Sequence, residues 1–283
     1  MKKTAIACAL AMLVLPVFVA CSKGEAEADI PPIIEEVIPP VSEELPSVQE
    51  EPEQEPQEEA PQVSGKEEEE NTDKPAVAQY LKIKTDNLNV RKGAGASYAA
   101  LGKVEKNILM RYSGKSGDWF ETRYMGQKAF VHSAYAELVT LEKGSDVVER
   151  VIEEGLNVLG TPYIYGATRL HDGKGNLLKG FNDKKFDCSS LMQYIFYRGA
   201  DRLLDVTTRT QILQGREVSQ IQRGDLLFFT NASRKNNTGI ERVGHVALYL
   251  GDNYILHTAS DYAKIEQISS TRWSYFIAAR RVL

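Results

Sequence analysis

The sequence predicts an α+β protein in which a small all-β barrel precedes a larger part with helices packed on an antiparallel sheet. Three observations support this fold class. Residues 22–76 are acidic and rich in proline, which is typical of a disordered linker. Residues 80–141 form short alternating stretches separated by turn residues. The remaining residues begin with helical patterns and end with strand-like patterns, as α+β folds often do.

The first twenty residues are typical of an export signal. Lys2 and Lys3 precede an apolar stretch over residues 5–15, which is too short to span a bilayer comfortably. The run Phe18-Val19-Ala20-Cys21 resembles the lipobox of bacterial lipoproteins, in which the cysteine is diacylated and becomes the mature N-terminus. We therefore expect a signal peptide over 1–20 and a lipid anchor at Cys21 that holds the protein to a membrane outside the cytoplasm. The alternative is a simple secretory peptide cleaved nearby.

Residues 21–76 are predicted to be a disordered acidic linker. Residues 22–76 contain 18 Asp and Glu against 3 Lys, and 9 of the 11 prolines. The whole chain of 283 residues carries a net charge of −5, residues 22–76 carry −15, and Lys2 and Lys3 carry +2, so residues 77–283 carry +8. The acidity therefore belongs to a solvated tether, and the part that folds is basic. This composition excludes a collagen, a coiled coil, a polytopic membrane protein and a disulfide-stapled miniprotein.

Residues 77–141 are predicted to form the small barrel, with strands about ten residues apart. Three of its stretches resemble the bacterial SH3 domain of cell-wall proteins: Leu88-Asn89-Val90-Arg91, Gly117-Asp118-Trp119-Phe120 and Ala129-Phe130-Val131-His132. The resemblance implies a role in targeting or substrate positioning rather than in catalysis.

Residues 144–283 carry the predicted helices and sheet. A first helix is expected to start at Ser145 as its cap and to end at Gly160 and Pro162. A second helix is expected to begin at Asp187 and Cys188 and to stop at Gly199. The expected strands then follow at residues 225–229, 245–250, 254–259 and 276–282.

Cys188 is the candidate nucleophile. The chain has three cysteines, and Cys8 and Cys21 belong to the signal and the anchor, so no intramolecular disulfide is expected. A lone thiol is either a small buried hydrophobe or a reactive group. Asp187 is placed as a helix cap, which puts Cys188 in the first turn. The unpaired backbone N–H groups there favour thiolate over thiol and can receive an oxyanion.

Two histidines on neighbouring strands are the candidate bases. With a three-residue turn over 251–253, Ala247 lies opposite His257, and His245 then shares a face with His257. With a two-residue turn, the two imidazoles point to opposite faces. Cooperation between His245 and His257 therefore requires an odd loop or a β-bulge.

Five ordered motifs in residues 146–283 resemble the NlpC family of bacterial cell-wall cysteine peptidases. They are Gly160-Thr161-Pro162-Tyr163, Phe186-Asp187-Cys188-Ser189-Ser190, Gly224-Asp225-Leu226, Gly244-His245-Val246 and His257-Thr258-Ala259. The resemblance implies a circularly rearranged papain-like fold in which Cys188 is the nucleophile, His245 its base and His257 the residue that orients the base. It also implies substrate contacts from Asp187, Ser189 and Tyr163.

The same resemblance implies the substrate and the partners. The expected reaction is cleavage of peptidoglycan stem peptides or muropeptides at the γ-D-glutamyl to diamino-acid bond, with no cofactor and no metal. We expect a monomer that binds no nucleic acid. The sequence departs from the family at residues 204–208, where a Leu-Pro-Arg-Thr segment is usual, and in the long loop 168–186. His171 in that loop is expected to be solvated.

Other functions stay open at this point. One is a different acyl-transfer reaction on the same fold, by an amidase or a transferase. The other is a non-catalytic wall-binding lipoprotein with an idle cysteine.

Asp187 either binds a free amine of the substrate or serves only as a helix cap. The SH3-like part either narrows the cleft or only anchors the protein to the wall.

Overall fold

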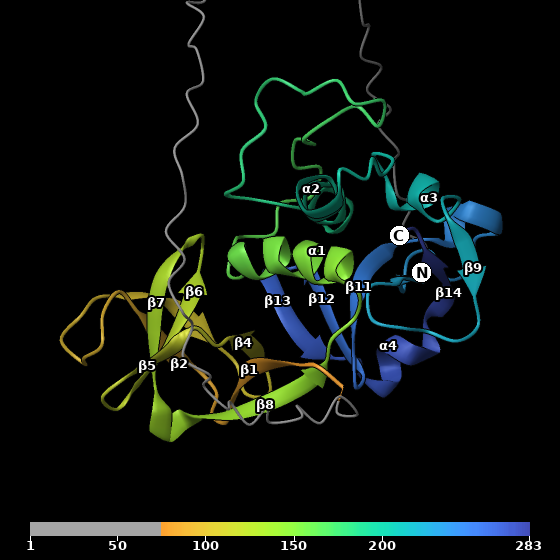
Figure 1. Ribbon diagram of the computed structural model, residues 1–283. Coiled ribbons are helices and arrows are strands. Elements are labelled where there is room, and N and C mark those ends of the chain that lie inside the picture. The colour runs from red at the N-terminus through yellow and green to blue at the C-terminus, as the bar shows by residue number, and fades with distance from the viewer. Residues whose placement is uncertain (1–74) are drawn as a thin grey trace, which may run out of the picture. The chain divides into compact units, whose positions relative to one another are not determined.

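The computed structural model describes residues 75–283 (Figure 1). The predicted signal peptide, Cys21 and all but the end of the predicted linker lie outside the described residues. Within the described part, no helix combines the length and the apolar character that crossing a membrane requires.

The N-terminal part is built from strands, as predicted. Their inward side chains, such as Val90, Val104 and Val131, are buried in one apolar cluster. A five-stranded sheet of order β3-β2-β7-β6-β5 forms one wall of this barrel. The strands are β1 (Val77–Ile83), β2 (Leu88–Arg91), β3 (Ala100–Val104), β4 (Leu109–Arg111), β5 (Gly114–Ser116), β6 (Trp119–Tyr124), β7 (Gln127–His132) and β8 (Ala136–Glu142), with a 3-10 turn at Ser133–Tyr135.

The C-terminal part consists of helices on antiparallel strands, which confirms the α+β prediction. In Figure 1, α1 and α2 lie on one face of the strands β11 to β13. The helices are α1 (Asp146–Asn157), α2 (Cys188–Ala200), α3 (Thr208–Gln211) and α4 (Ser270–Ser274), with a 3-10 turn at Gly239–Arg242. The strands are β9 (Arg216–Val218), β10 (Leu226–Phe229), β11 (His245–Gly251), β12 (Tyr254–Ala259), β13 (Tyr262–Gln267) and β14 (Phe276–Arg281).

A second sheet runs through both parts of the described chain. Its order is β8-β1-β4-β13-β12-β11-β10-β14-β9, and Leu109 of β4 pairs with Ile265 of β13. Tyr80 and Leu109 belong to the same buried cluster as Ile152 and Phe196 of the helices. The barrel strands β1 and β4 therefore take part in the core of the C-terminal part.

Two helix boundaries differ from the sequence predictions. Ser145 holds the N-cap position of α1, but its side chain makes no capping hydrogen bond. The helix ends at Asn157, earlier than Gly160, because Val158 already leaves the helical conformation. The helix α2 continues one residue beyond Gly199 and ends when Asp201 adopts the left-handed conformation.

Candidate active site

Cys188 is the first residue of α2, and Asp187 is its N-cap, as predicted. The Asp187 carboxylate accepts the backbone N–H of Ser190 at 2.9 Å, and the Ser190 hydroxyl accepts the backbone N–H of Asp187 at 2.8 Å. This reciprocal capping box fixes the direction of the first helical turn. It presents the backbone N–H groups of that turn beside the thiol.

The Asp187 carboxylate has no free face in this arrangement. Its Oδ1 atom also accepts the Ser189 hydroxyl at 3.1 Å, while Oδ2 accepts the backbone N–H of Gly166 at 3.1 Å. The Arg169 guanidinium forms an ion pair with Oδ2 at 2.9 Å and donates a hydrogen bond, at 3.0 Å, to the Ser189 hydroxyl. Asp187 is only 4% exposed. Its charge is therefore balanced inside the protein by Arg169.

The surroundings of Cys188 favour the thiol over the thiolate, which is the opposite of the predicted tendency. Burial raises the pKa of Cys188 to about 11, and the nearby Asp187 charge adds to that shift. Hydrogen bonds from the backbone N–H groups of Val246 and Ser189 act in the other direction but do not compensate. The position of Cys188 at the helix start does not predict this pKa, because it carries no information on the burial of the sulfur.

A β-bulge brings the two histidines to one face of the hairpin, which confirms the geometric condition drawn from the sequence. The turn itself has two residues, Asp252 and Asn253, both with positive φ. Leu248 lies opposite Leu256, and the register shifts before Gly251 pairs with Tyr254. The extra residue restores the register that a three-residue loop gives. As a result, Nε2 of His245 lies 3.0 Å from Nδ1 of His257.

Glu266 extends this pair to a chain of three side chains. It stands on β13 on the same face as His257, and its Oε1 atom lies 3.0 Å from Nε2 of His257. Burial alone raises the pKa of Glu266, but the hydrogen bond from His257 and the charges of Lys264 and Arg272 outweigh it and lower that pKa to about 2. Glu266 is thus a carboxylate that accepts hydrogen bonds and donates none.

The carboxylate determines the proton positions along the chain. Burial lowers the pKa of His257 and lowers that of His245 well below its usual value, so both rings are neutral near pH 7. Because Glu266 only accepts, we assign the His257 proton to Nε2, and Nδ1 of His257 then accepts from Nε2 of His245. The free lone pair of His245 is therefore on Nδ1. This tautomer is the one that a base acting through Nδ1 requires.

Cys188 and His245 line the same cleft, which has a volume of about 380 Å³. Tyr163 lines it too, and burial together with the charge of Asp187 raises the pKa of its hydroxyl, which remains a neutral donor. Of the three predicted substrate contacts, Tyr163 alone appears among the described residues that line the cleft; Asp187 and Ser189 lie beneath it with Arg169. The lining residues run from 163 to 275, so none of them comes from the barrel strands.

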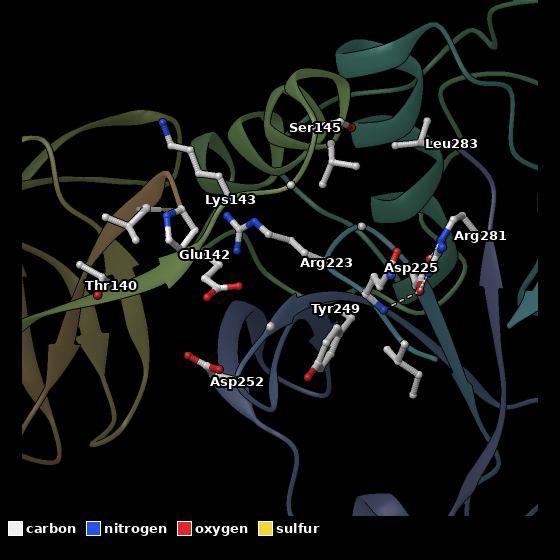
Figure 2. A pocket seen from close by; sticks show the side chains of 18 residues that line it. Thr140, Glu142, Lys143, Ser145, Arg223, Asp225, Tyr249, Asp252, Arg281 and Leu283 are labelled. Carbon is white, nitrogen blue, oxygen red and sulfur yellow. Dashed lines mark hydrogen bonds and ion pairs between the residues drawn. The ribbon is translucent and has the colours of Figure 1, made fainter. Parts of the chain in front are cut away.

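A larger cavity of about 840 Å³ lies elsewhere, beside the start of α1 (Figure 2). Two of its charged side chains pair with each other, and a third pairs with a residue outside the lining. Arg281 and Asp225 stand side by side with contacts of 2.7 and 2.8 Å, and Arg223 donates to Glu149 and to the Tyr80 hydroxyl. Neither a cysteine nor a histidine is among the described residues that line it. The candidate nucleophile and base therefore lie in the smaller cleft.

The prediction that His171 is solvated is wrong. Its side chain has no exposed surface and packs 5.3 Å from the ring of Tyr197 on α2. Its Nδ1 atom accepts the backbone N–H of Gly173 at 3.0 Å, and its own backbone N–H donates to Gln193. His171 therefore packs on α2, whereas residues 176–180 of the same loop are exposed. This packing also holds Arg169 against Asp187.

Two family models and several curated proteins match this chain. The model of the NlpC/P60 family matches residues 160–282, and the model of the bacterial SH3 domain matches residues 86–137. The peptidoglycan endopeptidase RipA of Mycolicibacterium smegmatis is 30% identical over 139 residues, which cover 47% of this chain and 26% of that protein. The γ-D-glutamyl-L-lysine dipeptidyl-peptidase of Bacillus subtilis is 26% identical over 194 residues, which cover 67% of this chain and 59% of that protein.

Among solved structures, a crystal structure of an NlpC/P60 family protein from Bacillus cereus covers 73% of this chain and 64% of its own, at 21% identity and a TM-score of 0.39. The chain matches between 26% and 59% of the length of the two curated relatives named above. Both predicted resemblances are confirmed by the family models. Residues 160–282 are a domain of the NlpC/P60 family, and residues 86–137 are a bacterial SH3 domain.

Proposed function

We propose that the protein is a cysteine endopeptidase that hydrolyses peptidoglycan stem peptides outside the cytoplasm. The observation that carries the proposal is the cleft in which Cys188 lies with His245, whose tautomer is set by His257 and Glu266. The names of the two relatives, one of which is a γ-D-glutamyl-L-lysine dipeptidyl-peptidase, support the substrate class. We infer that the scissile bond is the amide between γ-D-glutamate and the diamino acid.

The first step is attack by a thiol that loses its proton as it reacts. Since Cys188 and His245 are both neutral at rest, the Sγ proton passes to Nδ1 of His245 while sulfur bonds to the carbonyl carbon. The carbonyl oxygen becomes an oxyanion that the backbone N–H of Cys188 at the start of α2 stabilises. The Tyr163 hydroxyl faces the same cleft and is a second donor for that oxygen.

The later steps return the enzyme to its starting state. The carbon–nitrogen bond breaks, and the leaving amine takes the proton from Nδ1 of His245. Water then attacks the thioester and gives its proton to the same nitrogen. The carbon–sulfur bond breaks, the carboxylic acid product leaves, and Cys188 recovers its proton. His257 and Glu266 stabilise the imidazolium that forms twice in this cycle.

The sequence supports the proposed roles of the other parts of the chain. We propose a signal peptide over 1–20, lipidation at Cys21, a tether over 21–76, an SH3-like domain over 77–141 and the peptidase domain over 144–283. In this scheme the protein acts as a monomer, and the SH3-like domain supports binding to the wall. We further propose that Asp187 is a helix cap balanced by Arg169, because four protein donors already occupy its oxygens.

Digestion of purified muropeptides followed by mass spectrometry tests the proposal. The wild-type protein is expected to release fragments whose masses identify the γ-D-glutamyl to diamino-acid bond. Cys188→Ala and Cys188→Ser are expected to release none, and circular dichroism should show that both remain folded since Asp187 still caps the helix. Fragments from the sugar–peptide bond would instead identify an amidase. Retained wall binding without any cleavage by the wild type would identify a binding protein.

A further inference from the structure

Arg272 is the charged residue of the cleft that the proposed reaction does not use. It lies in α4 and lines the cleft together with Cys188 and His245. Among the described residues that line this cleft, it is the one with a permanent charge, and none of them carries a carboxylate. Its side chain is 25% exposed. Its charge is shared with Glu266, which does not line the cleft.

The guanidinium of Arg272 is held in place with most of its donors still available. Its Nη2 atom lies 3.0 Å from Oε1 of Glu266, and within residues 75–283 this is the one hydrogen bond that its side chain donates. A guanidinium carries five N–H donors. Its central carbon stands 6.0 Å from the ring centre of Phe229, whose ring lies 6.2 Å from that of His245. The free donors thus belong to a side chain that lines the same cleft as His245.

A second polar group on the same wall lacks a partner. Thr230 lines the cleft and is 5% exposed, and its buried Oγ1 atom forms no hydrogen bond within the described part of the chain. The backbone N–H of Thr230 donates to the carbonyl of Tyr275 at 2.8 Å, which ties Thr230 to the end of α4. Buried hydroxyls normally find a partner. An oxygen of a bound ligand can supply it.

We propose that Arg272 and Thr230 bind a carboxylate of the substrate beside the scissile amide. This inference rests on the proposed function and deepens it. A stem peptide offers two such groups, the α-carboxylate of the γ-linked glutamyl residue and the second carboxylate of a diamino acid such as diaminopimelate. An arginine fork matches a carboxylate through charge-assisted hydrogen bonds. The amide of an amidated glutamyl residue lacks the charge and presents only one acceptor oxygen.

Four peptides separate the two sources of the carboxylate. They combine a glutamyl α-carboxylate or its amide with either lysine or diaminopimelate, and kcat/KM is measured for each. We expect the wild type to prefer the acid over the amide, or diaminopimelate over lysine, by about 10-fold to 100-fold, the range for a charge-assisted contact. Arg272→Gln should reduce the preference to less than 3-fold. Arg272→Lys should keep part of it, because the charge remains.

Two further variants complete the series. Thr230→Val should weaken the same preference without removing it. Arg216→Gln, which changes an exposed arginine on β9, should leave both the rates and the preference unchanged. Equal kcat/KM values of the wild type for all four peptides overturn the inference. So does an Arg272→Gln variant that keeps the full preference.

The preference is a ratio of kcat/KM values between two peptides. It therefore separates binding of a carboxylate from a disturbance of the His245–His257–Glu266 contacts. Arg272 also contacts Glu266, so its loss can slow every peptide, but such an effect cancels in the ratio. Glu266→Gln should slow all four peptides by the same factor and keep the preference.

Calorimetry with Cys188→Ala distinguishes failure of the inference from failure of the proposed function. If the wild type cleaves nothing while Cys188→Ala binds the acid more tightly than the amide, the peptidase proposal fails and the carboxylate site stands. If the wild type cleaves peptides and Arg272→Gln keeps the preference, the carboxylate site fails and the peptidase proposal stands.

Discussion

The Nε2 atom of His257 lies 3.0 Å from Oε1 of Glu266, and this contact determines which nitrogen of His245 is free to act as a base. Since Glu266 is ionised and both histidines are neutral, one proton sits between each pair of neighbours along the chain. The geometry thus extends the proposed nucleophile–base pair outward to β13.

Glu266→Gln should lower kcat by about 10-fold to 1,000-fold with little change in KM, because the glutamine can donate to His257 and reverse the proton order. Stopped-time peptide assays measure both constants. Glu217→Gln on the exposed strand β9 is the matched control and should behave as the wild type. An unchanged kcat for Glu266→Gln would show that His257 keeps its tautomer without the carboxylate.

The two histidines should differ in the size of their effects. His245→Ala removes the base and should lower kcat by about 100-fold to 10,000-fold. His257→Ala leaves the base in place but less well oriented, so kcat should fall by a smaller factor. Turnover numbers of both variants with one peptide substrate decide the order. The reverse order would assign the base to His257.

The reactivity of Cys188 should rise with pH without reaching a plateau below pH 10. Its raised pKa of about 11 means that the thiolate fraction, and with it the rate of alkylation by iodoacetamide, grows about tenfold per pH unit in this range. The rate is followed by mass spectrometry, with N-acetylcysteine as the reference thiol. A plateau already present at pH 7 would indicate a resting thiolate–imidazolium pair.

Glu266 should also make stability depend on pH in the acid range. Its pKa of about 2 in the folded protein lies below the value of an unfolded chain, so the unfolded state binds more protons between about pH 5 and pH 2. The free energy of unfolding therefore falls as pH falls through this window. Urea titrations should show a shallower fall for Glu266→Gln, whereas Glu217→Gln should keep the wild-type slope. Equal slopes for Glu266→Gln and the wild type would argue against an ionised, paired carboxylate.

Acetylation of the stem-peptide N-terminus should change kcat/KM by less than 3-fold. The Asp187 carboxylate is shared among Arg169, Gly166, Ser189 and Ser190, so it is not available to an ammonium group. Paired assays of the free and the acetylated peptide give the ratio. A strong preference for the free amine would mean that the substrate displaces Arg169, and Arg169→Gln should then strengthen that preference.

The two tryptophans offer a test of the shared sheet. Trp119 lies in β6 and Trp273 in α4, so Trp273→Phe and Trp119→Phe each leave one fluorescent reporter. Both reporters should unfold at the same denaturant concentration, because Leu109 of β4 is buried with the helix residues. Leu109→Ala should destabilise both by about 2–5 kcal/mol, while the exposed Leu138→Ala should have little effect. Separate transitions would show two independent folding units.

Much of the site was predictable from local patterns. The cap at Asp187 follows from residue type and position alone, and the condition on the His245–His257 hairpin follows from the period of a strand. The actual bulge was not predictable, because two turn residues with positive φ and one extra residue give the same register as a longer loop. The family resemblance supplied the roles, and the family models support it.

The features of the site that local patterns did not predict depend on contacts between distant segments. Glu266 was missed because no strand was expected over Tyr262–Gln267, although Ala263 and Ile265 alternate with Lys264 and Glu266 as a strand requires. The neutral thiol was missed because burial comes from strands far along the chain. His171 was placed in solvent on the basis of a glycine-rich turn, and no local signal shows that this turn packs on α2.

The sheet that passes from β4 to β13 makes the covalent link over residues 142–145 redundant for holding the two parts together. The pairing of Leu109 with Ile265 and the hydrogen bond between Tyr80 and Arg223 remain when the backbone is cut at Gly144. A protease that cleaves there would leave a nicked but assembled molecule. Two separately produced fragments, one ending at Lys143 and one starting at Gly144, would then meet as complementary halves of one β-sheet.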